Sequence, residues 1–158
     1  MTNTVKPETA GVIAPPPLIH LAGLAIAIVL DYAVRPLPIT DGAWRWLPAA
    51  LLISSGAVFI ALPGVRFRLA KTALRPWKPT TALVTDGIYR LSRNPIYVGM
   101  ALVYAGLGFG LNTIWAFGLL VVVLPVMHFG VIRREEKYLE TLFGDNYRAY
   151  KETTPRWL

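Results

Sequence analysis

The chain contains no cysteine. This absence excludes thiol catalysis, disulfide bonds and metal sites built from cysteine, although it does not identify the cellular compartment. The 158 residues contain no internal repeat, and acidic residues are scarce: 9 Asp and Glu stand against 16 Lys and Arg, for a formal net charge of +7. The length is that of a single domain.

Apolar residues, by contrast, are abundant. They make up 54% of the chain, and the mean hydropathy is +0.48, which is too high for an ordinary soluble domain. Four apolar stretches of 17 to 19 residues are each just long enough to cross a bilayer core of roughly 30 Å. They are Leu18–Val34, Trp44–Leu62, Pro95–Leu111 and Ile114–Ile132. The sequence therefore predicts an all-α membrane protein with four transmembrane helices and a long connecting loop after the second.

The two ends of the chain differ from this apolar middle. Residues 1–17 are polar and rich in proline, which predicts a flexible N-terminal tail. No basic start with a small-residue cleavage site precedes the first apolar stretch, so we expect no signal peptide. Residues 18–158 are predicted to form one transmembrane domain. Its last apolar stretch continues as a C-terminal amphipathic helix to Phe143, and Gly144 suits the position that ends it.

Basic residues are concentrated in two of the polar segments. Seven of the 16 Lys and Arg lie in residues 64–94 and six in residues 133–158, whereas the turn Asn112–Thr113 carries none. Because basic loops stay on the cytoplasmic side, both termini and the 64–94 loop are predicted to face the cytoplasm. The predicted location is a bacterial inner membrane. The charge then serves topology and contact with anionic lipid rather than nucleic acid, and no obligate protein partner is indicated.

The first region that could form a binding or catalytic site lies just before the third apolar stretch. Asn94 followed by Pro95 is a good helix start, with a side chain that can cap and a proline in the first turn. A helix N-terminus beside Arg93 is also suited to binding an anion at the membrane face. Tyr89 and Tyr97 can stack on the ring of a ligand or donate a hydrogen bond to it. The alternative is that they serve only as anchors at the membrane interface.

The second region is a pair of glutamates after the fourth apolar stretch. Glu135 falls on the apolar stripe of the amphipathic helix, whereas Glu136 follows on its polar side. The other positions of that stripe are Val131, Ile132, Tyr138, Leu139, Leu142 and Phe143. A carboxylate turned away from water is costly, which indicates a function for Glu135. The structural alternatives are a salt bridge from Glu135 to Arg93 or Arg133, and a solvated charge at Glu136.

His128 precedes Glu135 by seven residues, so the two lie on nearly the same helix face, about 10 Å apart along the axis. Two residues at this separation do not make a zinc site. His128 is therefore either a hydrogen-bonded packing residue or a polar group of the same site. Pro125, one turn earlier, frees a backbone carbonyl and can kink the helix.

Four ordered pieces of sequence resemble a known family. They are Leu83-Val84-Thr85-Asp86-Gly87-Ile88-Tyr89, then Arg93-Asn94-Pro95-Ile96-Tyr97-Val98-Gly99, then Glu135-Glu136 with Leu139, and last Phe143-Gly144-Asp145-Asn146-Tyr147 with Tyr150. In this order, with a two-span hairpin between, they resemble the isoprenylcysteine carboxyl methyltransferase and phospholipid methyltransferase superfamily of integral membrane enzymes. The resemblance covers residues 80–158.

The resemblance implies S-adenosylmethionine as the methyl donor, bound at the cytoplasmic face. By the family pattern, the cofactor contacts fall on Thr81, Ala82, Leu83, Val84, Gly87, Tyr89, Asn94, Pro95, Ile96, Tyr97, Glu135 and Glu136, and the candidate catalytic residues are Arg93, Glu135 and His128. The physical chemistry agrees, because the sulfonium and ammonium of the donor can pair with a carboxylate, and its own carboxylate suits Arg93 or a helix N-terminus.

Two departures bear on the methyl acceptor. Asn94 stands where the isoprenylcysteine branch has histidine, and Val131 stands where that branch has an arginine that meets the substrate carboxylate. We therefore expect a small lipophilic or amphiphilic acceptor that enters from the bilayer, such as a thiol or a lipid amine, rather than a prenylcysteine carboxylate.

Two other functions remain open at this point. One is an NADPH-dependent membrane reductase related to sterol reductases, and the other is a non-catalytic protein whose basic loops bind anionic lipid. Because only position 135 falls on the apolar stripe, the methyltransferase hypothesis predicts that Glu135→Gln weakens cofactor binding far more than Glu136→Gln.

Overall fold

The computed structural model of the chain describes residues 9–69 and 83–158. Within these ranges the regular elements are all helical. The longer helices are α1 (Pro16–Ala33), α2 (Trp46–Leu69), α3 (Pro95–Leu111), α4 (Ile114–Met127), α5 (Arg133–Phe143) and α6 (Asp145–Thr153). Three single turns accompany them: η1 (Ala43–Arg45), η2 (Gly87–Arg90) and the π-helical turn η3 (His128–Ile132), which joins α4 to α5.

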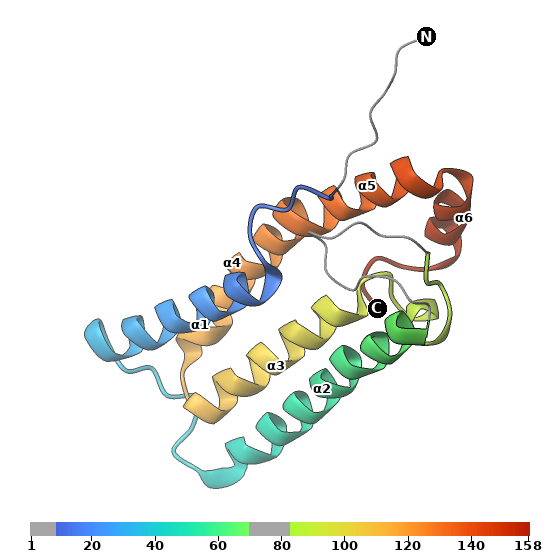
Figure 1. Cartoon of the computed structure of the whole chain (residues 1–158). Coiled ribbons are helices and arrows are strands. Elements are labelled where there is room, and N and C mark those ends of the chain that lie inside the picture. Colours follow the sequence, from blue (N-terminus) through green and yellow to red (C-terminus); the bar gives the residue numbers. More distant parts are fainter. Residues whose placement is uncertain (1–8, 70–82) are drawn as a thin grey trace.

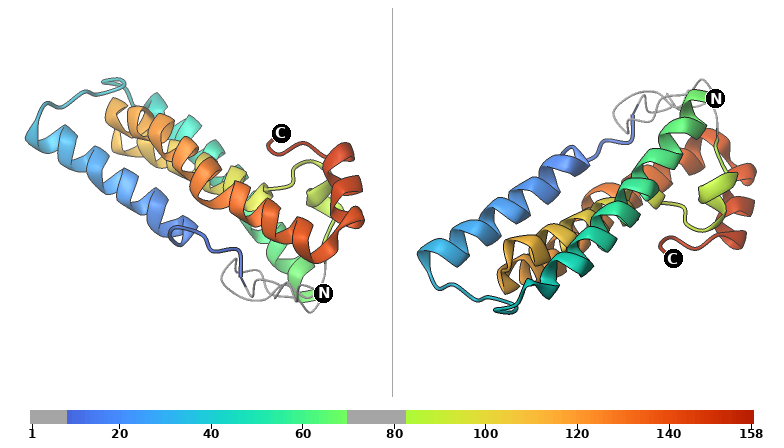
Figure 2. Two further views of the ribbon diagram at one scale, coloured as in Figure 1. Left: turned by 90° about the horizontal axis from the view of Figure 1, so that it is seen from above. Right: turned by 90° about the horizontal axis from the view of Figure 1, so that it is seen from below.

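The helices form an elongated bundle (Figure 1), with α3 packed between α2 and α4 and with α1 packed mainly against α4 and also against α3. The two further views confirm that α1 and α2 lie on the outside of the bundle (Figure 2). The start of α1, the end of α2, the start of α3 and both C-terminal helices lie at one end, and the turns 34–45 and 112–113 lie at the other. The residues predicted to be functional are therefore gathered at a single end.

Among the described residues, three helices are long and apolar enough to cross a membrane: Pro16–Ala33, Ala43–Val65 and Ile114–Phe143. The helix α3 is equally apolar but has only 17 residues. Large apolar side chains on the outer faces are exposed, as a lipid-facing surface requires. The predicted all-helical membrane architecture is thus confirmed for three of the four expected spans.

Two predicted boundaries are wrong. The helix α1 begins at Pro16, inside the predicted tail, because a proline is well tolerated in the first turn of a helix. The helix α2 passes through Pro63 and ends at Leu69, beyond the predicted apolar stretch that ends at Leu62. A proline removes one hydrogen bond, and here that loss does not stop the helix.

Part of the N-terminal segment lies against the bundle. The amide of Ile13 donates to the carbonyl of Gly130 over 3.2 Å, and Nη1 of Arg134 donates to the carbonyl of Gly11 over 2.8 Å. Residues 1–8 lie outside the described residues, so the flexibility of the tail stays a prediction.

The contact between α2 and α3 depends on two facing glycines. A Cβ atom at Gly99 would lie 2.7 Å from the carbonyl oxygen of Gly56, and one at Gly56 would lie 2.6 Å from that of Gly99. Only hydrogen fits at either position, so the two backbones approach as closely as small residues allow in membrane helices.

We expect Gly99→Ala to lower the stability of the bundle by about 1–3 kcal/mol, the usual effect of overpacking a tight contact. The midpoint of thermal unfolding in detergent measures this loss. Gly118→Ala is the matched control, because a Cβ atom at Gly118 in α4 meets nothing within 4 Å. An unfolding midpoint lowered equally by both changes would contradict the glycine contact.

Candidate functional site

The π-helical turn η3 determines which way the glutamate pair faces. A π-helical turn holds one residue more than an α-helical turn. Met127, Val131 and Ile132 are all fully buried through this turn, and Glu136 follows Ile132 by four residues. Glu136 is only 7% exposed, and Glu135 is half-buried beside it. The interpretation that only Glu135 faces inward is therefore wrong, because it extended one period of 3.6 residues through the π-helical turn. The structural alternative of a solvated charge at Glu136 is also wrong.

Glu135 pairs with a tyrosine from α3. The hydroxyl of Tyr97 donates to Oε1 of Glu135 over 2.5 Å. Glu135 lies in the first turn of α5, beyond the apolar part of the helix that ends at Ile132. Burial raises the pKa of its carboxyl to about 7, although the hydrogen bond from Tyr97 acts in the opposite direction. Among the described residues no cationic side chain forms an ion pair with Glu135. Its carboxylate therefore keeps the capacity to bind a cation.

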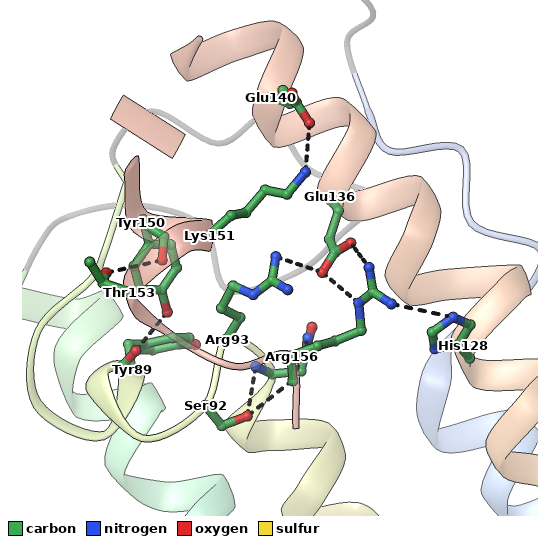
Figure 3. Close-up of polar contacts among 11 residues, drawn as sticks. Tyr89, Ser92, Arg93, His128, Glu136, Glu140, Tyr150, Lys151, Thr153 and Arg156 are labelled. Atoms are coloured by element: carbon green, nitrogen blue, oxygen red, sulfur yellow. Dashed lines mark hydrogen bonds and ion pairs between the residues drawn. The ribbon is translucent and has the colours of Figure 1, made fainter. Parts of the chain in front are cut away.

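Glu136 lies between two arginines (Figure 3). Its Oε1 is 3.0 Å from Nη1 of Arg93 and accepts from Nε of Arg156 over 2.9 Å, and its Oε2 accepts from Nη2 of Arg156 over 2.7 Å. The side chains of Arg93 and Glu136 are each 9% exposed and that of Arg156 is 33% exposed. The hydrogen bond to Glu136 raises the pKa of Arg156. Two guanidinium groups on one carboxylate leave a net charge of +1 in this cluster.

The segment that follows α6, residues 154–158, is held against the start of α3. The hydroxyl of Ser92 and the side-chain nitrogen Nδ2 of Asn94 both donate to the backbone carbonyl of Arg156, over 3.3 and 3.0 Å. The helix α3 begins at Pro95, as predicted, but the Asn94 side chain does not cap it. Asn94 instead fixes the C-terminal segment in place.

A cluster of tyrosines lies beside these charges. The hydroxyl of Tyr150 donates to the carbonyl of Tyr89 over 2.7 Å, and Tyr147 is almost fully buried next to it. Burial raises the pKa of Tyr147 to about 12, and burial with nearby Tyr150 and Glu135 also raises that of Tyr89. Leu83 and Val84 pack against this cluster. It fixes the loop before α3 to the helix α6.

His128 lies at the end of an open apolar groove between α3 and α4. The groove has a volume of about 710 Å³ and is lined by apolar side chains, among them Trp157. Nε2 of His128 lies 3.5 Å from Nη1 of Arg156. Because arginine only donates, Nε2 of His128 is the acceptor in any hydrogen bond between the two side chains. His128 therefore belongs to the polar group of Glu136, not to that of Glu135 as its spacing suggested.

Most of the predicted site residues come together at this end. Gly87 adopts φ +60°, which the turn into η2 requires and which favours glycine. Pro95 is buried, and Ile96 packs against the apolar end of the long helix. Thr81 and Ala82 lie outside the described residues. That these residues bind a cofactor, and that Arg93, Glu135 and His128 act in catalysis, stays a prediction.

The sequence did not identify Arg156. It follows Pro155 in a short segment without periodicity, and its partners are 20 to 64 positions away in the chain. The available signal was composition alone: an arginine beside Trp157 and Leu158.

A helical membrane bundle with a polar, partly buried site at one end is the class of protein that the fold defines. The chain belongs to the phospholipid methyltransferase family, whose model matches residues 44–146. The resemblance noted in the sequence is thereby confirmed.

Individual relatives add to this assignment. The chain is 30% identical to the cobalt-zinc-cadmium resistance protein CzcN of Cupriavidus metallidurans over 73% of its own length and 51% of that protein. It is 38% identical to the protein-S-isoprenylcysteine O-methyltransferase of Schizosaccharomyces pombe over 46% of its own length and 31% of that protein. The chain thus spans about half of the first relative and a third of the second. No solved structure matches it.

Proposed function

We propose that the protein is a membrane methyltransferase that uses S-adenosylmethionine and acts on a lipophilic or amphiphilic acceptor. The observation that carries the proposal is Glu135: a carboxylate held by Tyr97, half-buried, and not in an ion pair with any described residue. A cationic ligand accounts for such a group better than packing does. Membership of the phospholipid methyltransferase family supports the same activity.

The residues present fit the donor. Glu135 would pair with its ammonium or face its sulfonium, and the rings of Tyr89 and Tyr97 would add cation–π attraction. Arg93 has a buried Nε without a hydrogen-bond partner among the described residues, which suits the donor's carboxylate. When bound, S-adenosylmethionine supplies an activated methyl group.

The protein itself contributes position and the exclusion of water. Tyr97 fixes the orientation of Glu135, and the Arg93–Glu136–Arg156 cluster fixes the loop that precedes α3. The tyrosine cluster packs with Leu83 and Val84, which precede the site in the chain. Methyl transfer needs little acid or base assistance, so rigid placement in a dry site is the main source of rate enhancement.

In this proposal α3 completes a fourth span, and the end that carries the site faces the cytoplasm. The basic residues of segments 64–94 and 133–158 support that orientation. Fusing a reporter that is active only in the cytoplasm to the C-terminal residue tests it.

Titration calorimetry of the detergent-purified protein with S-adenosylhomocysteine and, separately, with NADPH tests the function. We expect S-adenosylhomocysteine to bind and NADPH not to bind. Absence of the first would sink the methyltransferase proposal. Tight binding of NADPH would favour a reductase, and binding of neither would favour a lipid-binding role for the basic loops.

The affinity for S-adenosylhomocysteine is expected to rise between pH 6 and pH 8. The raised pKa of Glu135, about 7, keeps its carboxyl neutral below this window and charged above it, and only the charged form attracts the ligand's ammonium. Calorimetry across the window measures the change. In Glu135→Gln this rise in affinity should vanish, and a rise that persists in the variant would contradict the role of Glu135.

A further inference from the structure

Three residues just before α1, Gly11, Val12 and Ile13, form a strap across the junction of η3 and α5. The amide of Ile13 donates to the carbonyl of Gly130 in η3 over 3.2 Å. Nη1 of Arg134, in the first turn of α5, donates to the carbonyl of Gly11 over 2.8 Å. The strap therefore binds the long helix on both sides of this junction, and the proposed cofactor site gives it no role.

The side chains of the strap add apolar contacts at the same place. A Cβ atom at Gly130 would overlap Cδ1 of Ile13 and lie 2.8 Å from its Cγ1, so Ile13 lies directly on the helix backbone. Val12 packs against the buried cluster that contains Tyr97, whose hydroxyl donates to Glu135. The strap thus contacts both the π-helical turn and the cluster that includes the partner of Glu135.

The winding of η3 determines where Glu135 points. An α-helix has 3.6 residues per turn, so a change of register by one residue rotates all that follows by roughly 100°. A π-helical turn carries one extra residue, and its relaxation to α-helical winding would therefore turn Glu135 away from Tyr97. Because the strap is bound on both sides of the junction, the same rotation would also carry Arg134 away from Gly11 and break their hydrogen bond.

We propose that the strap is a positioning element of the cofactor site, which holds η3 in its π-helical winding and so keeps Glu135 against Tyr97. This inference rests on the proposed methyltransferase function. Coupling between two binding events is reciprocal. A ligand that needs Glu135 in this orientation therefore also tightens the contact of the strap with the helix, whereas a strap that serves packing alone does not respond to the ligand.

Alkylation of an introduced cysteine tests this coupling. The chain contains no cysteine, so Val12→Cys supplies a single thiol, which reacts with N-ethylmaleimide when the strap leaves the helix. Saturating S-adenosylhomocysteine should slow this reaction in the detergent-purified protein by roughly fivefold or more, the lower end of typical coupling between sites. Thr141→Cys, at an exposed position of α5, is the matched control and should react at the same rate with and without ligand. Equal rates at Val12→Cys with and without ligand overturn the inference.

Two neighbouring arginines provide a second test. Arg134→Ala and Arg133→Ala each remove one exposed positive charge from the same turn, but Arg133 lies over the ring of Phe129 and not against the strap. We expect Arg134→Ala to weaken S-adenosylhomocysteine binding about fivefold more than Arg133→Ala, the effect of one hydrogen bond. Equal affinities of the two variants contradict a positioning role.

The unmodified protein separates this inference from the proposed function. If it binds S-adenosylhomocysteine while the strap is not protected and the two arginine variants bind equally, only the positioning role is wrong. If the unmodified protein does not bind this ligand, the methyltransferase function is wrong and the positioning role falls with it.

Discussion

Replacement of Glu136 by alanine is expected to destabilise the protein by about 3–5 kcal/mol, the usual result of removing one partner from a buried ion pair. The carboxylate is the ion-pair partner of Arg93, whose side chain is 9% exposed, and of Arg156. Without it, two guanidinium groups repel each other in a site with little water. The midpoint of thermal unfolding in detergent, followed by tryptophan fluorescence, measures the loss.

Glu140 provides the control on the same helix. It pairs with Lys151 and Arg148, but at the surface, where such pairs contribute little. We expect Glu140→Ala to leave the unfolding midpoint almost unchanged. Similar losses at Glu136 and Glu140 would show that the buried cluster is not what holds the loop before α3.

Replacement of Glu135 by glutamine is expected to weaken binding of S-adenosylmethionine and S-adenosylhomocysteine by roughly tenfold to a hundredfold, with little effect on stability. The reason is the loss of a charged partner, about 1.5–3 kcal/mol, at 1.4 kcal/mol for each factor of ten. The glutamine oxygen can still accept from Tyr97, so the local structure persists. Calorimetry on the variant measures the loss.

Two comparisons sharpen this result. Tyr97→Phe keeps the charge of Glu135 but frees its orientation, so we expect a smaller loss of affinity than in Glu135→Gln. If the Glu135 carboxylate faces the sulfonium, the glutamine variant should lose more affinity for S-adenosylmethionine than for S-adenosylhomocysteine, whose sulfur is an uncharged thioether. A glutamine variant that binds both ligands normally would remove Glu135 from the site.

The two glutamates therefore differ by function, not by the side of the helix they occupy. The sequence predicted that one faced inward and the other outward, and the π-helical turn η3 makes both face inward. Glu136 is bound to two arginines, whereas Glu135 is bound only to Tyr97 among the described residues. We still expect different effects from substitution of the two glutamates, but for another reason. A change at Glu136 lowers stability, whereas a change at Glu135 lowers the affinity for the ligand.

Features set by neighbouring residues were predictable from the sequence. The start of α3 at Pro95 follows from the asparagine and proline together, and the end of α5 at Phe143 follows from Gly144, which adopts φ +53°. The apolar stretches predicted the long helices because membrane spans need a minimum length.

Features set by distant residues were not predictable in this way. Periodicity carries no information on a local change to π-helical winding, and η3 has no proline or charge within it to indicate one. The contacts of Arg156 depend on where α6 directs the chain, which no local pattern specifies. Sequence reasoning therefore located the end of the bundle that carries the site but misassigned the partners within it.

The contacts that build this site also bear on the order in which the protein is completed during synthesis. Tyr97 is 38 positions from its partner Glu135, and Asn94 is 62 from its partner Arg156. The helices α2 and α3 can already pack through Gly56 and Gly99 when these partners have not yet left the ribosome. A nascent chain that has inserted α1, α2 and α3 thus holds Arg93 without its carboxylate partner, so the site can form only after α5 and residues 154–158 have followed.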